Sequence, residues 1–144
     1  MDLKKYKDKF SEYNYYEKDG EEVLHGIYKE YDKNGELRAE HNYKNGKLHG
    51  LCKGYDKNGK LESENNFKNS KPHGLCKGYY EDGQLEWEDN FKDGEIHGLC
   101  KRYYGNGKLK SEYNYKDGEL EEYEHKKEGG WNGTENLYYF GNKF

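Results

Sequence analysis

The sequence predicts an all-β protein, an elongated, open, single-layer antiparallel β-meander of about ten or eleven strands built from 24-residue repeats. Three observations support this prediction: a fixed 24-residue period, two turn sequences in each period, and alternating apolar positions between the turns. A constant period of this size is typical of a stack of identical supersecondary units. The period is marked most clearly by a recurring dipeptide: His25-Gly26, His49-Gly50, His73-Gly74 and His97-Gly98.

The composition fits a thin structure better than a conventional globular core. Of the 144 residues, 31% are hydrophobic and 38% are charged, so few aliphatic side chains are available to fill an interior. Yet 17% are aromatic, which argues against a disordered chain. The charges are interleaved and sum to −4, so there is no basic footprint for nucleic acid or anionic lipid. We therefore expect no nucleic-acid partner and, because no long apolar segment occurs, no membrane anchor in this chain.

The repeat array is predicted to span residues 10–126. It begins at about Phe10 with a strand, because residues 11–15 closely match residues 111–115. Residues 1–9 precede the array and are expected to be loosely ordered. The stretch 17–24 is two residues longer than its counterparts, which predicts a wider turn.

One unit, residues 49–72, shows how the strands are predicted. It contains two runs of seven or eight residues, each followed by a turn tripeptide, Lys57-Asn58-Gly59 or Lys68-Asn69-Ser70. Asn-Gly or Asp-Gly between short runs is a strong hairpin signal, because glycine accepts the positive φ that closes the turn. Ser70 stands where the other units carry glycine, and this predicts strain or a different turn type.

The alternation of residues predicts which side chains share a face. If residues 57–59 form a type I turn followed by a left-handed glycine, Tyr55 pairs with Leu61. Alternation along both strands then places the apolar residues of this unit on one side: Leu51, Tyr55, Leu61 and Phe67. The other side carries small and acidic residues: Gly50, Cys52, Gly54, Glu62 and Glu64.

Residues 127–144 are interpreted as a C-terminal cap. Glu121-Glu122 occupies the place where the next His-Gly is due, and a glycine-rich turn and an apolar strand at residues 135–140 follow. Repeat arrays need such caps, because an unprotected end strand pairs with other chains. Trp131 lies in this cap, where it either serves binding or covers the end of the sheet.

The equally spaced cysteines and histidines favour a structural interpretation over a metal or redox site. Equivalent residues of consecutive units lie two strands apart, at about 9 to 10 Å. A disulfide needs Cα atoms within roughly 7 Å, and zinc needs ligands at about 2.0 to 2.3 Å from one centre. We therefore expect no metal, no cofactor and three reduced thiols, at Cys52, Cys76 and Cys100. Free thiols fit a reducing compartment, and we expect the protein to be cytoplasmic.

The His-Gly pairs are expected to have a backbone role. Each glycine would mark a bulge or a close approach at the start of a strand, with the imidazole packed near the preceding turn. Two charged rows accompany them, one acidic and one basic: Glu40, Glu64, Glu88 and Glu112, and Lys29, Lys53, Lys77 and Lys101. These rows are either cross-strand ion pairs or a charged strip for a partner.

The aromatic residues are the better candidates for binding. A single-layer sheet has nothing to cover its sides except its own side chains, and tyrosine and tryptophan are favoured at binding surfaces. The candidate residues are Tyr55, Phe67, Tyr79, Trp87, Phe91 and Tyr103. Trp87 is the strongest of them, because its counterparts Ser63 and Ser111 are small.

The repeat resembles a known one. The pattern H-G-L-x-K-x-Y-x-x-x-G-x-L, followed by E-x-x-Y/F-x-N/D-G-x-L/I, is similar to the MORN-variant repeat of bacterial antitoxins of the YwqK family. The resemblance covers roughly residues 10–126. It implies an elongated, twisted antiparallel meander that neutralises a toxin by direct binding, and it brings no catalytic residues.

The favoured function is accordingly a non-enzymatic protein-binding scaffold of the antitoxin or immunity type, with another protein as its partner. No Ser-His-Asp order, P-loop or glycine-rich nucleotide loop occurs, so an enzyme is not expected. Two alternatives remain: a structural or membrane-proximal scaffold, and a carbohydrate- or ligand-binding module that uses the aromatic row.

Overall fold

The protein is all-β, as predicted. The computed structural model describes residues 1–125 and 135–139, and the chain divides into two compact units, Met1–Lys71 and Pro72–Phe144. The described residues form fifteen strands and no helix. In each unit the strands follow one another as an antiparallel meander with the 24-residue repeat, so the predicted fold class is confirmed.

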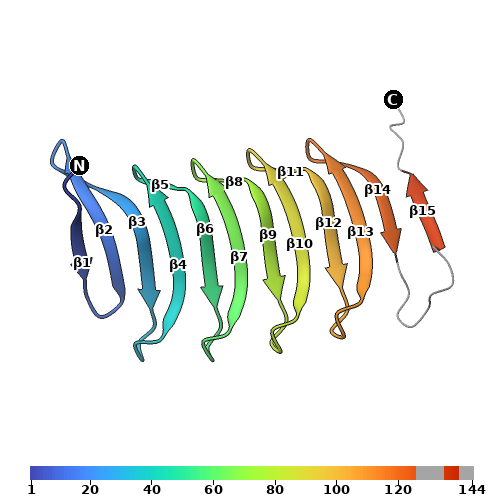
Figure 1. Ribbon diagram of the computed structural model, residues 1–144, viewed down its shortest axis with the longest axis horizontal. Helices are drawn as coiled ribbons and strands as arrows, with labels where there is room; N and C mark the ends of the chain where they lie inside the picture. Colours follow the sequence, from blue (N-terminus) through green and yellow to red (C-terminus); the bar gives the residue numbers. More distant parts are fainter. Residues whose placement is uncertain (126–134, 140–144) are drawn as a thin grey trace. The chain divides into compact units, whose positions relative to one another are not determined.

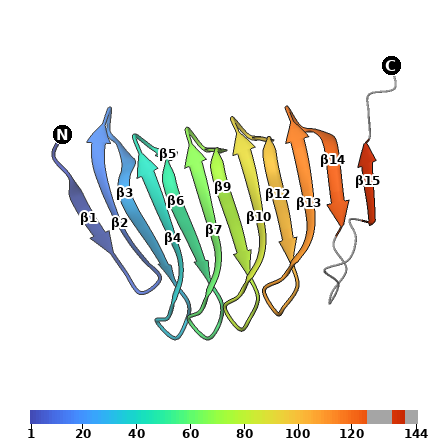
Figure 2. The ribbon, with the colours of Figure 1, turned by 45° about the vertical axis from the view of Figure 1, so that its right-hand side comes forward.

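The first unit is a single layer of strands (Figure 1; seen from a second angle in Figure 2). The strands pair in the order β1-β2-β3-β4-β6-β7, and the short β5 pairs with β4. Their bounds are β1 (Lys4–Lys7), β2 (Ser11–Lys18), β3 (Glu21–Tyr31), β4 (Leu37–Lys44), β5 (Lys47–Leu48), β6 (Gly50–Tyr55) and β7 (Leu61–Lys68). The two-residue strand β8 (Lys71–Pro72) lies at the unit boundary.

The second unit repeats this arrangement. Its strands pair in the order β9-β10-β12-β13-β14-β15, and the short β11 pairs with β10. Their bounds are β9 (Gly74–Tyr79), β10 (Leu85–Lys92), β11 (Glu95–Ile96), β12 (Gly98–Tyr103), β13 (Leu109–Lys116), β14 (Glu119–His125) and β15 (Glu135–Tyr139). The apolar strand expected at residues 135–140 is therefore present as β15, whereas Trp131 lies outside the described residues.

The strand number exceeds the predicted ten or eleven for two reasons. First, Lys4–Lys7 form β1 and pair with β2, which differs from the loose order expected of residues 1–9. Tyr6 of β1 stacks on Tyr13 of β2, and this contact gives the N-terminal strand a packing partner. Second, the backbone breaks at each His-Gly from the second repeat onward, which separates β5, β8 and β11 from the longer strands that follow.

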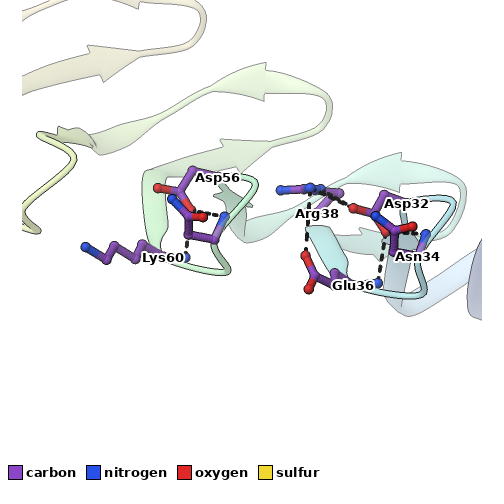
Figure 3. Close-up of polar contacts among 7 residues, drawn as sticks. Asp32, Asn34, Glu36, Arg38, Asp56 and Lys60 are labelled. Atoms are coloured by element: carbon purple, nitrogen blue, oxygen red, sulfur yellow. Dashed lines mark hydrogen bonds and ion pairs between the residues drawn. The ribbon is translucent and has the colours of Figure 1, made fainter.

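The first turn of each repeat closes as the sequence predicts. Gly35 and Gly59 have φ of 80° and 78°, and Tyr55 pairs with Leu61. An aspartate at the start of the turn holds it: Asp32 Oδ1 accepts the backbone N–H groups of Asn34 (2.8 Å) and Glu36 (3.1 Å) (Figure 3).

Asp56 does the same in the next repeat, where its Oδ1 accepts the backbone N–H groups of Asn58 at 2.8 Å and Lys60 at 3.0 Å. Only the first of these two turns has a guanidinium. Arg38 Nε and Nη2 donate to Asp32 Oδ2 at 3.0 and 2.6 Å, and residue 62, which corresponds to Arg38 one repeat later, is a glutamate.

The second turn of each repeat is a two-residue turn rather than a tripeptide. Lys44 pairs with Lys47, and the central residues Asn45 and Gly46 both have positive φ, as a type I′ turn requires. The turn at Asp19-Gly20 is equally tight, because Lys18 pairs with Glu21. The wider turn predicted for residues 17–24 is therefore wrong: the two extra residues lengthen the paired strands instead.

Ser70 adopts the conformation of the glycine that it replaces. Its φ is 63°, so the expected strain is present while the turn type is kept. A left-handed conformation costs a residue with a Cβ roughly 1–2 kcal/mol. The Ser70 hydroxyl offsets part of this cost, because its Oγ accepts the backbone N–H of Leu48 at 3.1 Å.

The predicted distribution of side chains between the two faces holds for β6 and for the pair of Tyr55 with Leu61, but it is wrong for β7 beyond the bulge. The register shifts between Gly54 and Tyr55, so Cys52 pairs with Asn65 and Gly50 pairs with Phe67. This bulge adds one residue to β7 and reverses its alternation relative to β6. Phe67 therefore lies on the face of Cys52, and Tyr55 lies on the opposite face.

Each unit thus has two distinct faces. The cysteine face carries Cys52 in the first unit and Cys76 and Cys100 in the second, together with the residues paired with them. The lysine face carries Lys29 and Lys53 in the first unit and Lys77 and Lys101 in the second. Among the described side chains only the three cysteines and Ser111 are buried, so neither unit has a conventional core.

The turn aspartates predict acid sensitivity. Backbone N–H donors lower the pKa of Asp32 and Asp56 below the ordinary value, and Arg38 adds to the effect at Asp32. A lowered folded-state pKa contributes stability that is fully present above the unfolded pKa of about 3.9 and is lost as the pH falls through the folded pKa. We expect the melting temperature to fall below about pH 4, and to fall less in Asp32→Asn.

Thermal melts followed by far-UV circular dichroism between neutral and acidic pH test this. Lys33→Gln is the control, because it changes the charge of the same exposed turn while leaving the carboxylate in place. Equal losses of melting temperature in the wild-type protein and Asp32→Asn would contradict the assignment.

Candidate functional site

The His-Gly pairs have the backbone role that the sequence predicts. Gly26, Gly50, Gly74 and Gly98 have φ of 92°, 97°, 89° and 92°, in the region that disfavours any side chain. The backbone N–H of His49 donates to Asn42 O, and that of His97 donates to Asn90 O, both at 2.8 Å. Each pair is therefore a bulge, which lies within β3 in the first repeat and at the start of β6, β9 and β12 in the later ones.

The histidine side chains bind the type I′ turn at the end of the same repeat, whereas the sequence predicted contact with the turn that precedes them. His25 Nδ1 accepts the backbone N–H of Asn45 at 3.3 Å. In the second unit, His73 and His97 accept the backbone N–H groups of Asp93 and Asp117 at 3.2 Å. The donor is each time the first positive-φ residue of a type I′ turn. These imidazoles therefore have a structural role, as acceptors that hold the turn backbone.

A second structural residue was missed by the sequence analysis. Asn90 Nδ2 donates to Leu99 O at 2.7 Å, across the bulge that His97-Gly98 creates. Asn42 makes the same bond to Leu51 O in the first unit. The signal was present in the sequence, since asparagine recurs in step with the histidines: Asn42, Asn66, Asn90 and Asn114.

Loss of this asparagine is expected to weaken the second unit. Asn90→Ala removes the donor to Leu99 O and should lower the free energy of unfolding by about 1 kcal/mol, the usual net value of one hydrogen bond. Urea denaturation measures the change. Lys92→Ala, an exposed position on the same strand, is the control and should stay within about 0.5 kcal/mol of the wild type. A loss no larger than that of the control would show that the bond is not needed.

The six predicted binding aromatics do not form one ladder. Tyr55 and Tyr103 lie on the lysine face, where their hydroxyls donate to Glu40 at 2.6 Å and to Glu88 at 2.7 Å. Tyr79 has the same position in its repeat, because it pairs with Leu85 as Tyr55 pairs with Leu61. Phe67, Trp87 and Phe91 lie on the cysteine face, paired with Gly50, Gly78 and Gly74.

Burial and these carboxylates raise the pKa of Tyr55 and Tyr103 to about 12. The carboxylates themselves belong to a cross-strand row in which lysine and glutamate alternate. In the second unit Lys101 pairs with Glu88 on one side and Glu112 on the other, with its Nζ 3.9 Å from a carboxylate oxygen of each. Lys101 therefore forms the cross-strand ion pairs that one of the two interpretations of the charged rows expects.

Trp87 lies flat over Gly78. A Cβ added to Gly78 would lie 2.1 Å from Trp87 Nε1 and 2.3 Å from Cε2, so the indole covers the glycine backbone directly. On its other side Trp87 pairs with Arg102, whose guanidinium binds the Asp89 carboxylate through two bonds of 2.5 and 3.0 Å. The indole is half-buried, and its outer surface remains accessible.

The repeat boundaries can now be compared with known families. The MORN repeat variant profile matches four consecutive segments, residues 24–45, 48–69, 72–93 and 96–117. The chain belongs to the MORN repeat variant family. Each matched segment ends within the type I′ turn of its repeat, at Asn45, Asn69, Asp93 or Asp117. No curated protein matches the chain.

The three cysteines of the MORN-variant repeats are buried. Cys52, Cys76 and Cys100 form no disulfide and are buried, and burial raises the pKa of the Cys52 thiol and raises that of Cys100 to about 11. A thiol that stays protonated is a poor nucleophile and a poor metal ligand. That the three thiols stay reduced in solution remains a prediction.

The described residues hold no group of three or more His, Cys, Asp or Glu side chains that fits a metal ion. In that same part of the chain there is no helix of the length and apolarity needed to cross a membrane.

Proposed function

We propose that this MORN-variant protein is a non-enzymatic scaffold that binds another protein, and that it acts as an antitoxin or immunity protein by occluding a toxin. The observation that carries the proposal is the accessibility of its aromatic residues. All six predicted binding aromatics are only half-buried, because a single-layer unit has no second layer to cover them. Large, rigid rings at an accessible face offer contact area at a small entropic cost.

The cysteine face of the second unit is the favoured contact surface. It carries Phe91 and the cross-strand neighbours Trp87 and Arg102, and tryptophan and arginine are among the residue types enriched at binding hot spots. The glycine and cysteine residues of this face are small, so the larger side chains of Trp87, Phe91 and Arg102 project beyond them. On the lysine face, lysine and glutamate alternate across the paired strands, so opposite charges lie side by side and offer less binding energy.

The charge of the protein supports a basic partner. The net charge of −4 favours encounter with a positively charged cleft, such as that of a nuclease-like toxin, by electrostatic steering. The three free thiols fit a reducing compartment and therefore a cytoplasmic site of action.

Affinity capture from the native host, followed by identification of the bound protein, tests the proposal. The captured protein should be toxic when expressed alone in the host and harmless when this protein is co-expressed. A melting temperature raised by a sugar or another small molecule, with no protein captured, would replace the proposal by a ligand-binding function. Capture of a protein that is not toxic would retain the scaffold and remove the antitoxin role.

A further inference from the structure

Three tyrosines of the first unit form a stack on its cysteine face. Tyr6, Tyr13 and Tyr28 come from the adjacent strands β1, β2 and β3 and pair with one another across the sheet. The Tyr6 and Tyr13 ring centroids are 4.8 Å apart with an interplanar angle of 23°, and those of Tyr13 and Tyr28 are 5.2 Å apart at 11°. Tyr6 is the outermost ring and is 40% exposed.

Two carboxylates accompany the stack. The Tyr6 hydroxyl donates to Asp8 Oδ2, and the Tyr13 hydroxyl donates to Glu22 Oε2, both at 3.2 Å. Asp8 Oδ1 also accepts the backbone N–H groups of Phe10 at 2.9 Å and Ser11 at 2.6 Å and the Ser11 hydroxyl at 3.0 Å, so Glu22 is the carboxylate that keeps further acceptor capacity. The stacked rings therefore end in a negatively charged margin.

These two carboxylates have no basic partner. Neither Asp8 nor Glu22 forms an ion pair with any lysine or arginine of the described residues. The neighbouring acids differ, since Lys4 pairs with Glu17 at 2.7 Å, and Lys5 pairs with Glu12 at 2.5 Å. The uncompensated negative charge beside the stack thus selects a cationic occupant.

The second unit shows how a cysteine face holds an arginine. The guanidinium carbon of Arg102 lies 5.8 Å from the Tyr113 ring centroid, while its nitrogens bind the Asp89 carboxylate. The stack offers the same two kinds of group, a tyrosine ring and a carboxylate, but no arginine of the described residues binds them. Arginine suits it better than lysine, because the planar guanidinium stacks on rings and binds a carboxylate through two bonds.

We propose that the Tyr6–Tyr13–Tyr28 stack, with Asp8 and Glu22, is a docking site for an arginine side chain of a basic segment in a protein partner. This inference rests on the proposed protein-binding function and names the chemistry of the partner. The guanidinium lies over the exposed ring of Tyr6 and bonds to the free acceptor positions of Glu22.

Three short peptides test the site on the full chain: glycine alternating with arginine, with lysine, or with citrulline, which is the neutral counterpart of arginine. Isothermal titration at low salt should rank the affinities arginine, then lysine, then citrulline. Tyr6→Ser should weaken arginine binding about threefold and reduce its advantage over lysine, since an exposed cation–π contact is worth that much. Glu22→Gln should weaken both cationic peptides.

Glu36→Gln is the matched control, because it removes one exposed carboxylate from a turn that lies outside the stack. It should leave the preference for arginine over lysine unchanged. Equal affinity for the arginine and citrulline peptides would overturn the proposal. So would an unchanged preference for arginine in both Tyr6→Ser and Glu22→Gln, with far-UV circular dichroism showing that the variants are folded.

The captured protein partner separates this inference from the proposed function. A partner that binds the wild type and the Tyr6→Ser/Glu22→Gln double variant equally would refute the docking site and leave the scaffold function in place. An arginine preference without any protein partner would support the site and refute the protein-binding function.

Discussion

Gly78→Ala is expected to destabilise the second unit by about 2 to 3 kcal/mol, the upper part of the range of about 1 to 3 kcal/mol for overpacking a well-filled site. The added Cβ would overlap the indole ring of Trp87, whose nearest atoms lie 2.1 and 2.3 Å away. Gly78 does not have the positive φ of the turn and bulge glycines, so backbone strain contributes nothing to this cost. The loss is therefore expected to come mainly from the contact with Trp87.

Urea denaturation of a double-mutant cycle measures that contact. Trp87→Ser recreates at Gly78 the pairing that Gly54 has with Ser63 one repeat earlier, so Gly78→Ala should cost much less in the Trp87→Ser background. Contacting residues commonly show coupling of about 0.5 to 3 kcal/mol. Gly105→Ala is the control, since a Cβ there meets nothing within 4 Å. An equal cost of Gly78→Ala in both backgrounds would contradict the packing of Trp87 on Gly78.

The strands and turns could be predicted because their determinants are local. Asn-Gly and Asp-Gly pairs set the positive φ of each type I′ turn, and the strands follow from the 24-residue spacing between turns. Even the pairing of Tyr55 with Leu61 follows from the length of a single loop. Only the strained turn at Ser70 departs from the shared turn chemistry, and its position was predictable as well.

The faces could not be predicted, because they depend on one extra residue in the register. The bulge opposite Tyr55 reverses the alternation of β7, which moves Phe67 to the side of Cys52. Nothing in the local sequence distinguishes a bulged strand from a regular one. The predicted aromatic row was therefore split between two faces, although each of its members is at a predicted strand position.

The site residues had a signal that only cross-strand pairing reveals. In successive repeats the pairs are Gly54 with Ser63, Gly78 with Trp87, and Arg102 with Ser111. Two of these pairs set a large side chain against a small residue, Trp87 against Gly78 and Arg102 against Ser111, whereas Gly54 and Ser63 are both small. In the sequence Trp87 differs from its counterparts by its size. That it packs on Gly78 becomes visible only from the register of β9 and β10.

Trp87→Ser is expected to weaken partner binding by about 2 kcal/mol or more, the scale of a hot-spot residue. The outer surface of the indole is accessible and lies beside Arg102, so a partner seated on the cysteine face of this unit would bury it. The fold should survive, since Ser63 and Ser111 occupy the equivalent positions. Loss of a half-buried indole should lower the free energy of unfolding by about 1 to 2 kcal/mol.

Leu99→Ser provides the matched control. Leu99 belongs to the same unit and is 44% exposed, but it lies on the lysine face, two residues from Lys101. The Leu99→Ser substitution removes accessible apolar surface without changing the cysteine face, so partner affinity should stay close to that of the wild type. Titration of the identified partner and urea denaturation, applied to both variants, separate recognition from packing.

The pair of variants decides which face binds. Weak binding in Trp87→Ser with normal binding in Leu99→Ser would assign the partner to the cysteine face, where Trp87 would serve packing and recognition at once. The reverse result would assign the partner to the lysine face and restrict Trp87 to covering Gly78. Because the two faces share every strand, only side chains that point to opposite sides of the same layer can distinguish them.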